Sequence, residues 1–119
     1  RHERHAEATR RAVRSWGFEI QCSEPKEYSP VLTGVIMPTG HDADALRSVI
    51  LEKYNMSLGA GLGKIKGKVF RIGHLGDFND LMLMGTLSGV EMGLASAGVP
   101  HNKGGAQAAL DFLAGNSLS

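Results

Sequence analysis

The sequence predicts a single domain built from both helices and strands, and its length, composition and pattern all support this. At 119 residues the chain fits one domain with one compact core. Its composition, 42% hydrophobic and 21% charged, is typical of a folded globular protein rather than a disordered or membrane-embedded one. Segments with helical and strand-like spacing follow in the order helix, strand, strand, helix, strand, helix, helix, which indicates a mixed domain.

The first helix is predicted over residues 1–16. Its less polar residues recur at spacings of three and four, so they share one face of a helix, and Gly17 is a suitable end. The buried face is predicted to consist of Ala6, Thr9, Val13 and Trp16, whereas Arg4, Arg10, Arg11 and Arg14 project elsewhere, toward solvent.

Three strands are predicted. Residues 18–22 alternate apolar and polar side chains, and residues 31–37 form a short apolar run between two prolines. Residues 69–75 form the third strand, and Met56–Leu58 could start another. The glycines that follow at positions 59, 61, 63 and 67 favour a flexible or tightly turning loop.

Three further helices are predicted from residues that typically begin or end a helix. Asp42 is a plausible N-cap for a helix that ends at Asn55. A long helix is capped by Asp77 or Asn79, runs to about residue 97 and ends at Gly98, and a last helix spans residues 104–114.

The long helix carries glycines at positions 85, 89 and 93, so one side lacks bulk and a sheet or partner helix can approach closely. A membrane dimer seam is disfavoured, because Asp80 and Glu91 interrupt an apolar stretch shorter than the roughly 20 residues that span a bilayer.

Charge and cysteine content narrow the possible partners and compartment. A net charge of +1 gives no reason to expect a nucleic-acid or anionic-membrane surface. The single Cys22 excludes an internal disulfide framework and fits a reducing compartment, so we expect a cytoplasmic protein. The chain opens on Arg1 in a charged stretch unlike a signal peptide, and we read it as part of something longer.

Several familiar sites find no support in the residue spacing. The segment 59–64 resembles a phosphate loop, but Leu58 occupies the position of the required first glycine and Ile65 that of the hydroxyl, so a structural turn is favoured. The dinucleotide pattern fails because Lys64 replaces its last glycine. The histidines form no pair with metal-ligand spacing, and no nucleophile elbow surrounds Ser88, so we expect neither a metal nor hydrolysis.

Arg71 is the candidate functional residue, because it places a permanent charge inside an apolar strand pattern. Its planar guanidinium matches a carboxylate in two parallel hydrogen bonds. Three interpretations remain open from the residues alone: a ligand-binding group, a structural ion pair, or a solvent-facing strand position.

Two segments carry a family resemblance. The stretch 56–63, Met-Ser-Leu-Gly-Ala-Gly-Leu-Gly, and the stretch 67–79, Gly-Lys-Val-Phe-Arg-Ile-Gly-His-Leu-Gly-Asp-Phe-Asn, resemble class V aminotransferases, especially serine–glyoxylate and alanine–glyoxylate aminotransferases. The resemblance covers nearly the whole chain and extends back through residues 28–31 and 40–46. It implies an α+β fold: a small antiparallel sheet of about three strands covered by helices, as in the C-terminal domain of a fold-type I enzyme.

The resemblance also implies roles. Arg71 would bind the substrate carboxylate, and Gly59, Gly61 and Gly63 would form a loop near the active site. Residues 1–17 would be a linking helix and residues 18–119 the small domain. The parent would bind pyridoxal phosphate through a lysine of a large N-terminal domain, because none of the six lysines here lies in a matching segment.

The resemblance therefore predicts a homodimeric parent that moves an amino group from serine or alanine to glyoxylate or a similar 2-oxo acid, while this chain alone is inactive. The alternative from another class is a stand-alone α+β module that binds an amino or keto acid for regulation, or that serves dimerisation. Both would use Arg71, and they differ in whether a cofactor-binding domain precedes it.

Overall fold

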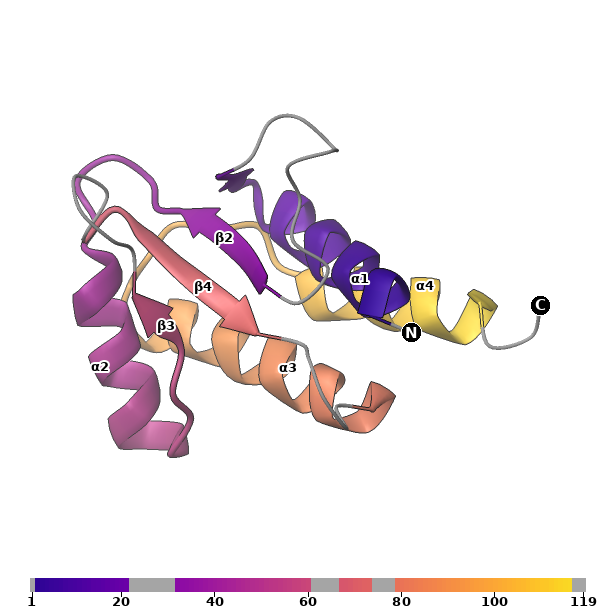
Figure 1. Ribbon diagram of the computed structural model, residues 1–119. Helices are drawn as coiled ribbons and strands as arrows, with labels where there is room; N and C mark the ends of the chain where they lie inside the picture. Colours follow the sequence, from indigo (N-terminus) through magenta and orange to yellow (C-terminus); the bar gives the residue numbers. More distant parts are fainter. Residues whose placement is uncertain (1, 22–31, 61–66, 74–78, 117–119) are drawn as a thin grey trace.

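The computed structural model describes residues 2–21, 32–60, 67–73 and 79–116, which form one antiparallel sheet with helices packed against it (Figure 1). The α+β prediction, a small antiparallel sheet covered by helices, is confirmed. In chain order the elements are α1 His2–Trp16, β1 Glu19–Ile20, β2 Leu32–Ile36, α2 Ala43–Tyr54, β3 Gly59–Ala60, β4 Val69–Gly73, α3 Asp80–Ser96 and α4 Gly105–Asn116.

The sheet has the strand order β1-β2-β4-β3, and all of its neighbouring strands are antiparallel. Its centre is the β2–β4 pair, in register from Leu32↔Gly73 to Ile36↔Val69. The three predicted strands are present, the first two in shortened form, and a fourth, β3, lies at the edge of the sheet. Residues 74–75, the predicted end of the third strand, lie outside the described residues. The prediction that Gly59 lies in a loop was therefore wrong, because its backbone pairs with β4.

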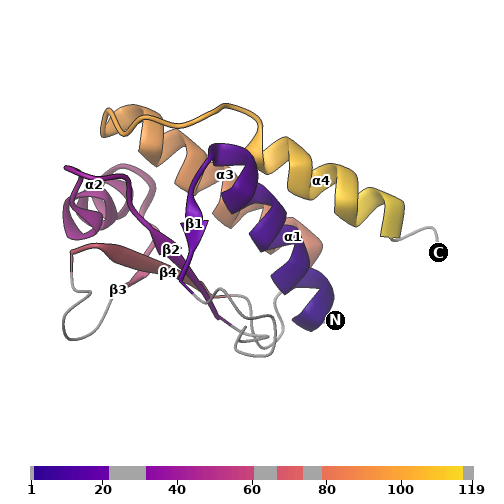
Figure 2. The same cartoon turned by 90° about the horizontal axis from the view of Figure 1, so that it is seen from above.

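The helices cover one face of this sheet. Strand residues that face the helices alternate with residues on the other face, and Val35, Phe70 and Ile72 are each 0% exposed. In both views α2 and α4 lie at opposite ends of the molecule (Figures 1 and 2). Helix α3 packs against both of them, and α1 packs against α4 and the first strands. The predicted apolar face of α1 is confirmed, since Ala6, Thr9, Val13 and Trp16 are all buried.

The helix-end predictions are confirmed by specific contacts. The Asp42 side chain accepts a hydrogen bond from the Asp44 amide at 3.0 Å, and Asn55 ends α2 in the left-handed conformation. The Asn79 side chain accepts one from the Met82 amide at 2.8 Å, which selects Asn79 as the cap of α3. Asp77, the other proposed cap, lies outside the described residues.

Two of the three glycines of α3 allow close packing, as predicted: Gly93 faces α2, and Gly89 faces Met56 in the segment after α2. A Cβ on Gly89 would lie 2.9 Å from the Met56 Cε, and one on Gly93 would overlap the side chain of Ile50. Gly85 is exposed and has no neighbour within 4 Å. None of the helices in the described ranges has the length and apolar character needed to cross a bilayer.

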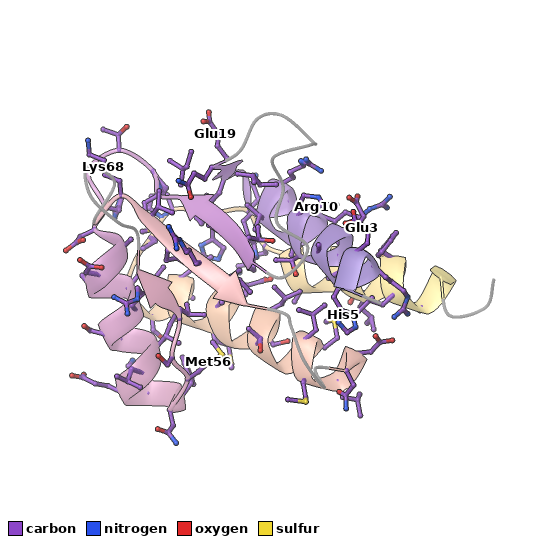
Figure 3. The ribbon with its side chains drawn as sticks, in the orientation of Figure 1. Glu3, His5, Arg10, Glu19, Met56 and Lys68 are labelled. Carbon is purple, nitrogen blue, oxygen red and sulfur yellow. The ribbon has the colours of Figure 1, made fainter. Side chains whose placement is uncertain are left out.

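Arg10 departs from the prediction of a solvated arginine face on α1, because its side chain is only 6% exposed. It donates hydrogen bonds to Glu3 and Glu7, each at 2.9 Å, so carboxylates one and two turns earlier on the same helix compensate its charge. Figure 3 shows Arg10 beside Glu3 on α1.

Candidate functional site

Arg71 lies in the middle of β4, on the sheet face opposite the helices. Its neighbours in the strand, Phe70 and Ile72, are both 0% exposed and belong to the core, whereas Arg71 is half-buried. Since successive strand residues point to opposite faces, this burial pattern directs the guanidinium away from the core. The sequence left three interpretations of Arg71 open. Its position on the open face of the sheet is consistent with two of them, ligand binding and exposure to solvent.

The structural ion-pair interpretation finds no partner among the described residues. Arg4, Arg10, Arg11 and Arg47 each have a carboxylate oxygen within 3.2 Å. Across residues 2–21, 32–60, 67–73 and 79–116, no such oxygen lies within 4.0 Å of the Arg71 guanidinium. An arginine on a sheet face without an ion pair is available to bind an anionic ligand.

Glycines flank Arg71 on both neighbouring strands. The register places Gly34 of β2 opposite Arg71 on one side and Gly59 of β3 opposite it on the other. Directly opposed residues put their side chains on the same face of a sheet, so neither adjacent strand adds a side chain at this level. The space beside the Arg71 stem is therefore left to other side chains or to the stem itself.

Gln21 partly fills the space over Gly34. A Cβ built on Gly34 would meet the Gln21 Oε1 at 2.5 Å and the Gln21 Cβ at 2.9 Å, so the exposed Gln21 side chain lies across this glycine. The backbone holds it there, because the Gln21 amide donates to the Gly34 carbonyl at 3.0 Å. Sequence reasoning could not identify this neighbour, because it depends on the pairing of β1 with β2.

Arg47 anchors the strand on the other side of Arg71. From α2 it donates a hydrogen bond through Nε to the Leu58 carbonyl at 2.8 Å, and its Nη1 contacts the Asp44 carboxylate at 3.2 Å. Because Leu58 precedes β3, this contact fixes that strand against the helix. Sequence reasoning also missed Arg47, whose spacing within α2 reveals the Asp44 pair but not the distant carbonyl.

A cavity of about 350 Å³ lies at one end of β2 and β4 and is lined by residues 36–41 and Lys68. Figure 3 shows Lys68 and Glu19 at this end of the sheet, far from the His5 and Glu3 end of α1. Gly61 and Gly63, the other members of the predicted loop, lie outside the described residues.

Comparisons with known proteins show relatives along nearly the whole chain. The chain is 43% identical over 122 residues to the serine–glyoxylate aminotransferase of Methylorubrum extorquens, covering 99% of this chain and 30% of the relative. It is 46% identical over 115 residues to the enzyme of the same name from Arabidopsis thaliana, covering 95% of this chain and 28% of the relative. To the L-aspartate–glyoxylate aminotransferase of Paracoccus denitrificans it is 41% identical over 109 residues, covering 92% and 28%. The chain thus spans less than a third of the length of these relatives.

Solved structures share the fold. The pyridoxamine–pyruvate aminotransferase of Mesorhizobium loti superposes with a TM-score of 0.87 at 29% identity, covering 97% of this chain and 30% of that one. The ureidoglycine–glyoxylate aminotransferase of Bacillus subtilis gives a TM-score of 0.85 at 27% identity, covering 94% and 29%. No family model matches the chain.

Proposed function

Because the chain belongs to the class V aminotransferases and matches their small C-terminal domain, we propose that it binds the carboxylate of an amino or oxo acid within a larger transaminase. Arg71 would be the binding residue. The observation that carries this proposal is a half-buried guanidinium, flanked by two glycines and without a carboxylate partner in the described part of the chain.

The geometry of guanidinium explains why this residue suits the task. Its two parallel N–H groups match the two oxygens of a carboxylate, and this pairing fixes the orientation of the acid as well as its charge. A transaminase must bind an amino acid and then an oxo acid in the same position. The carboxylate is the group that these substrates share, so one arginine can orient both.

The cofactor belongs, in this proposal, to the part of the protein outside this chain. When bound, pyridoxal phosphate would supply the aldehyde that takes up the amino group and the electron sink for the reaction, and a protein lysine would hold it. Among the described residues, Lys53, Lys68 and Lys103 are all exposed, and none lies in a segment that resembles the family's cofactor-lysine motif. Lys26, Lys64 and Lys66 lie outside them. We therefore expect this chain alone to be inactive.

The proposed reaction moves an amino group from serine or alanine to glyoxylate or a similar 2-oxo acid, in a cytoplasmic homodimer. Relatives named for serine–glyoxylate and L-aspartate–glyoxylate transfer support glyoxylate as the acceptor more strongly than any one donor. The donor would be chosen by residues that contact its side chain rather than by Arg71, which meets the carboxylate.

The test is Arg71→Ala in the full-length protein. Loss of a bidentate charged contact costs about 2–5 kcal/mol, so KM for both acids should rise by about 30-fold or more. Arg71→Lys should give an intermediate KM, because a lysine keeps the charge but loses the fork. Lys53→Ala, which removes an exposed cation from the end of α2, is the control and should leave KM unchanged.

Full activity of the Arg71→Ala enzyme would refute the proposed carboxylate role. Binding of the acids to the full-length protein without any transamination would instead favour the alternative of a regulatory binding module. Steady-state kinetics with each acid varied separately, together with a direct binding titration, distinguishes these outcomes.

A further inference from the structure

We infer that Gly59 is a positioning residue for Arg71: the missing side chain on β3 provides the space into which the Arg71 stem leans. This inference rests on the proposed function, in which the Arg71 guanidinium binds the substrate carboxylate. Gly59 would set the direction in which that guanidinium points. It differs from the role of a flexible loop glycine, because Gly59 lies in a paired strand.

The backbone does not require glycine at this position. Positive φ angles occur among the described glycines at positions 17, 40, 67, 98 and 104, and Gly59 is not one of them. An alanine could therefore adopt the same backbone conformation. The reason for a glycine must lie in what a side chain would touch.

A side chain at position 59 would collide with Arg71. A Cβ there would lie 3.2 Å from the Arg71 Cβ and 3.8 Å from the Arg71 Cδ. The 3.2 Å contact is tighter than most Cβ contacts in proteins, so an alanine would require the strands to give by a few tenths of an ångström, whereas 3.8 Å is an ordinary van der Waals distance. The nearest atom is a Cβ fixed to the backbone, and the Cδ contact shows that the stem runs over β3.

Neither strand can easily move to relieve this collision. Strand β4 is in the middle of the sheet between β2 and β3, and β3 is anchored to α2 by the hydrogen bond from Arg47 to the Leu58 carbonyl. Relief of the Cβ–Cβ contact therefore requires a shift of a few tenths of an ångström between two held strands. The Arg71 Cβ moves with β4 in such a shift, so a methyl group on residue 59 would displace the guanidinium.

The glycine on the opposite strand offers a matched control. The three atoms nearest to a Cβ on Gly34 all belong to Gln21, and none belongs to Arg71. The Gln21 amide group can swing away, whereas the Gln21 Cβ at 2.9 Å is fixed to the backbone, so Gly34→Ala shifts the chain at the end of β1 and not Arg71. Gly34 also lacks a positive φ. Gly34→Ala and Gly59→Ala therefore make the same chemical change beside the same arginine, but only Gly59→Ala presses on the arginine.

The experiment compares Gly59→Ala, Gly34→Ala, Arg71→Ala and the double variant Gly59→Ala/Arg71→Ala in the full-length enzyme, with kcat and KM measured for each acid. Because small displacements of a binding group are costly, Gly59→Ala should raise KM for both acids by about tenfold or more. Gly34→Ala should change KM by less than about twofold. In the Arg71→Ala background, Gly59→Ala should raise KM no further, since no guanidinium remains to be displaced.

The outcomes separate this inference from the proposed function. Equal KM values for the two glycine variants, or an additional KM increase from Gly59→Ala without Arg71, would overturn the positioning role. An unchanged KM in Arg71→Ala would refute the proposed function itself. If Gly59→Ala does not fold, Arg47→Gln provides the second test: it frees β3 without adding bulk, and it should also raise KM, whereas an unchanged KM would overturn the inference.

Discussion

Replacing Glu91 by alanine should destabilise the fold more than any single change on its surface, because one carboxylate holds three elements together. From α3, its Oε1 accepts hydrogen bonds from the Trp16 Nε1 of α1 at 2.9 Å and from the Ala106 amide of α4 at 2.9 Å. Its Oε2 accepts a third from the Gly104 amide at 3.0 Å. The carboxylate thus also caps the N-terminus of α4.

The magnitude follows from the donors that would lose their acceptor. Trp16 is 1% exposed, so its indole N–H cannot turn to water, and an unsatisfied buried donor costs about 1–3 kcal/mol. Loss of a helix cap adds about 1 kcal/mol. We expect Glu91→Ala to lower the free energy of unfolding by about 2–4 kcal/mol, and Glu91→Gln, which keeps one acceptor oxygen, by about half of that.

The same contacts predict a pH dependence. Burial alone would raise the pKa of Glu91, but its hydrogen bonds to Ala106, Trp16 and Gly104 and the charge of His101 together hold it below the ordinary value of 4.5. A carboxyl whose pKa is lowered on folding stabilises the protein above its unfolded pKa. This contribution is lost as the pH falls below about 4.5 and through the folded pKa.

Urea unfolding followed by the fluorescence of Trp16, the single tryptophan, measures both effects. Glu52→Ala is the control, because Glu52 is an exposed glutamate on α2, and its removal should change stability by less than about 0.5 kcal/mol. If Glu91→Ala were no less stable than Glu52→Ala at pH 7, or if its deficit did not shrink in acid, the three contacts would not stabilise the fold as argued.

Two further predictions concern packing and charge. Gly93→Ala should cost about 1–3 kcal/mol in urea unfolding, since its Cβ would overlap Ile50, whereas equal stability would show that α2 can move away. Asp80→Asn should cost about 1 kcal/mol at pH 7. The Arg4 hydrogen bond, opposed by burial and aided by His5, lowers the pKa of Asp80 to about 2, but its side chain is 44% exposed. Its contribution is present above the ordinary value of 3.8 and disappears as pH falls through about 2, so thermal unfolding at both ends of that range should show the deficit vanish in acid.

The features that the sequence predicted correctly are those whose signals lie within a few residues. The caps at Asp42 and Asn79 and the apolar face of α1 depend on neighbours one turn away. The bounds of the first two strands were predicted too long, because apolar alternation does not show how far the backbones stay paired. Strand β1 stops after Ile20 even though the apolar alternation continues.

The features that the sequence could not predict depend on contacts between distant segments. Glu91 was identified only as an interruption of an apolar helix, yet it binds groups on α1 and α4. Arg10 was placed toward solvent because helical periodicity describes one helix and not what covers it. Gly59 looked like a loop glycine, since its pairing with Arg71 is decided by register and not by the glycines next to it.

Two of the charges that interrupt apolar segments of this chain, Glu91 and Arg71, differ in their contacts. Every contact of Glu91 described above is to a group within this domain, so its carboxylate stabilises the fold. Its removal should therefore lower the free energy of unfolding. Arg71 has no carboxylate partner among the described residues, and a glycine lies opposite it on each neighbouring strand. A charged side chain that forms no ion pair within the protein adds little to the free energy of unfolding. In the proposed function, a substrate supplies the carboxylate that the described residues do not, so loss of Arg71 should appear in KM rather than in stability.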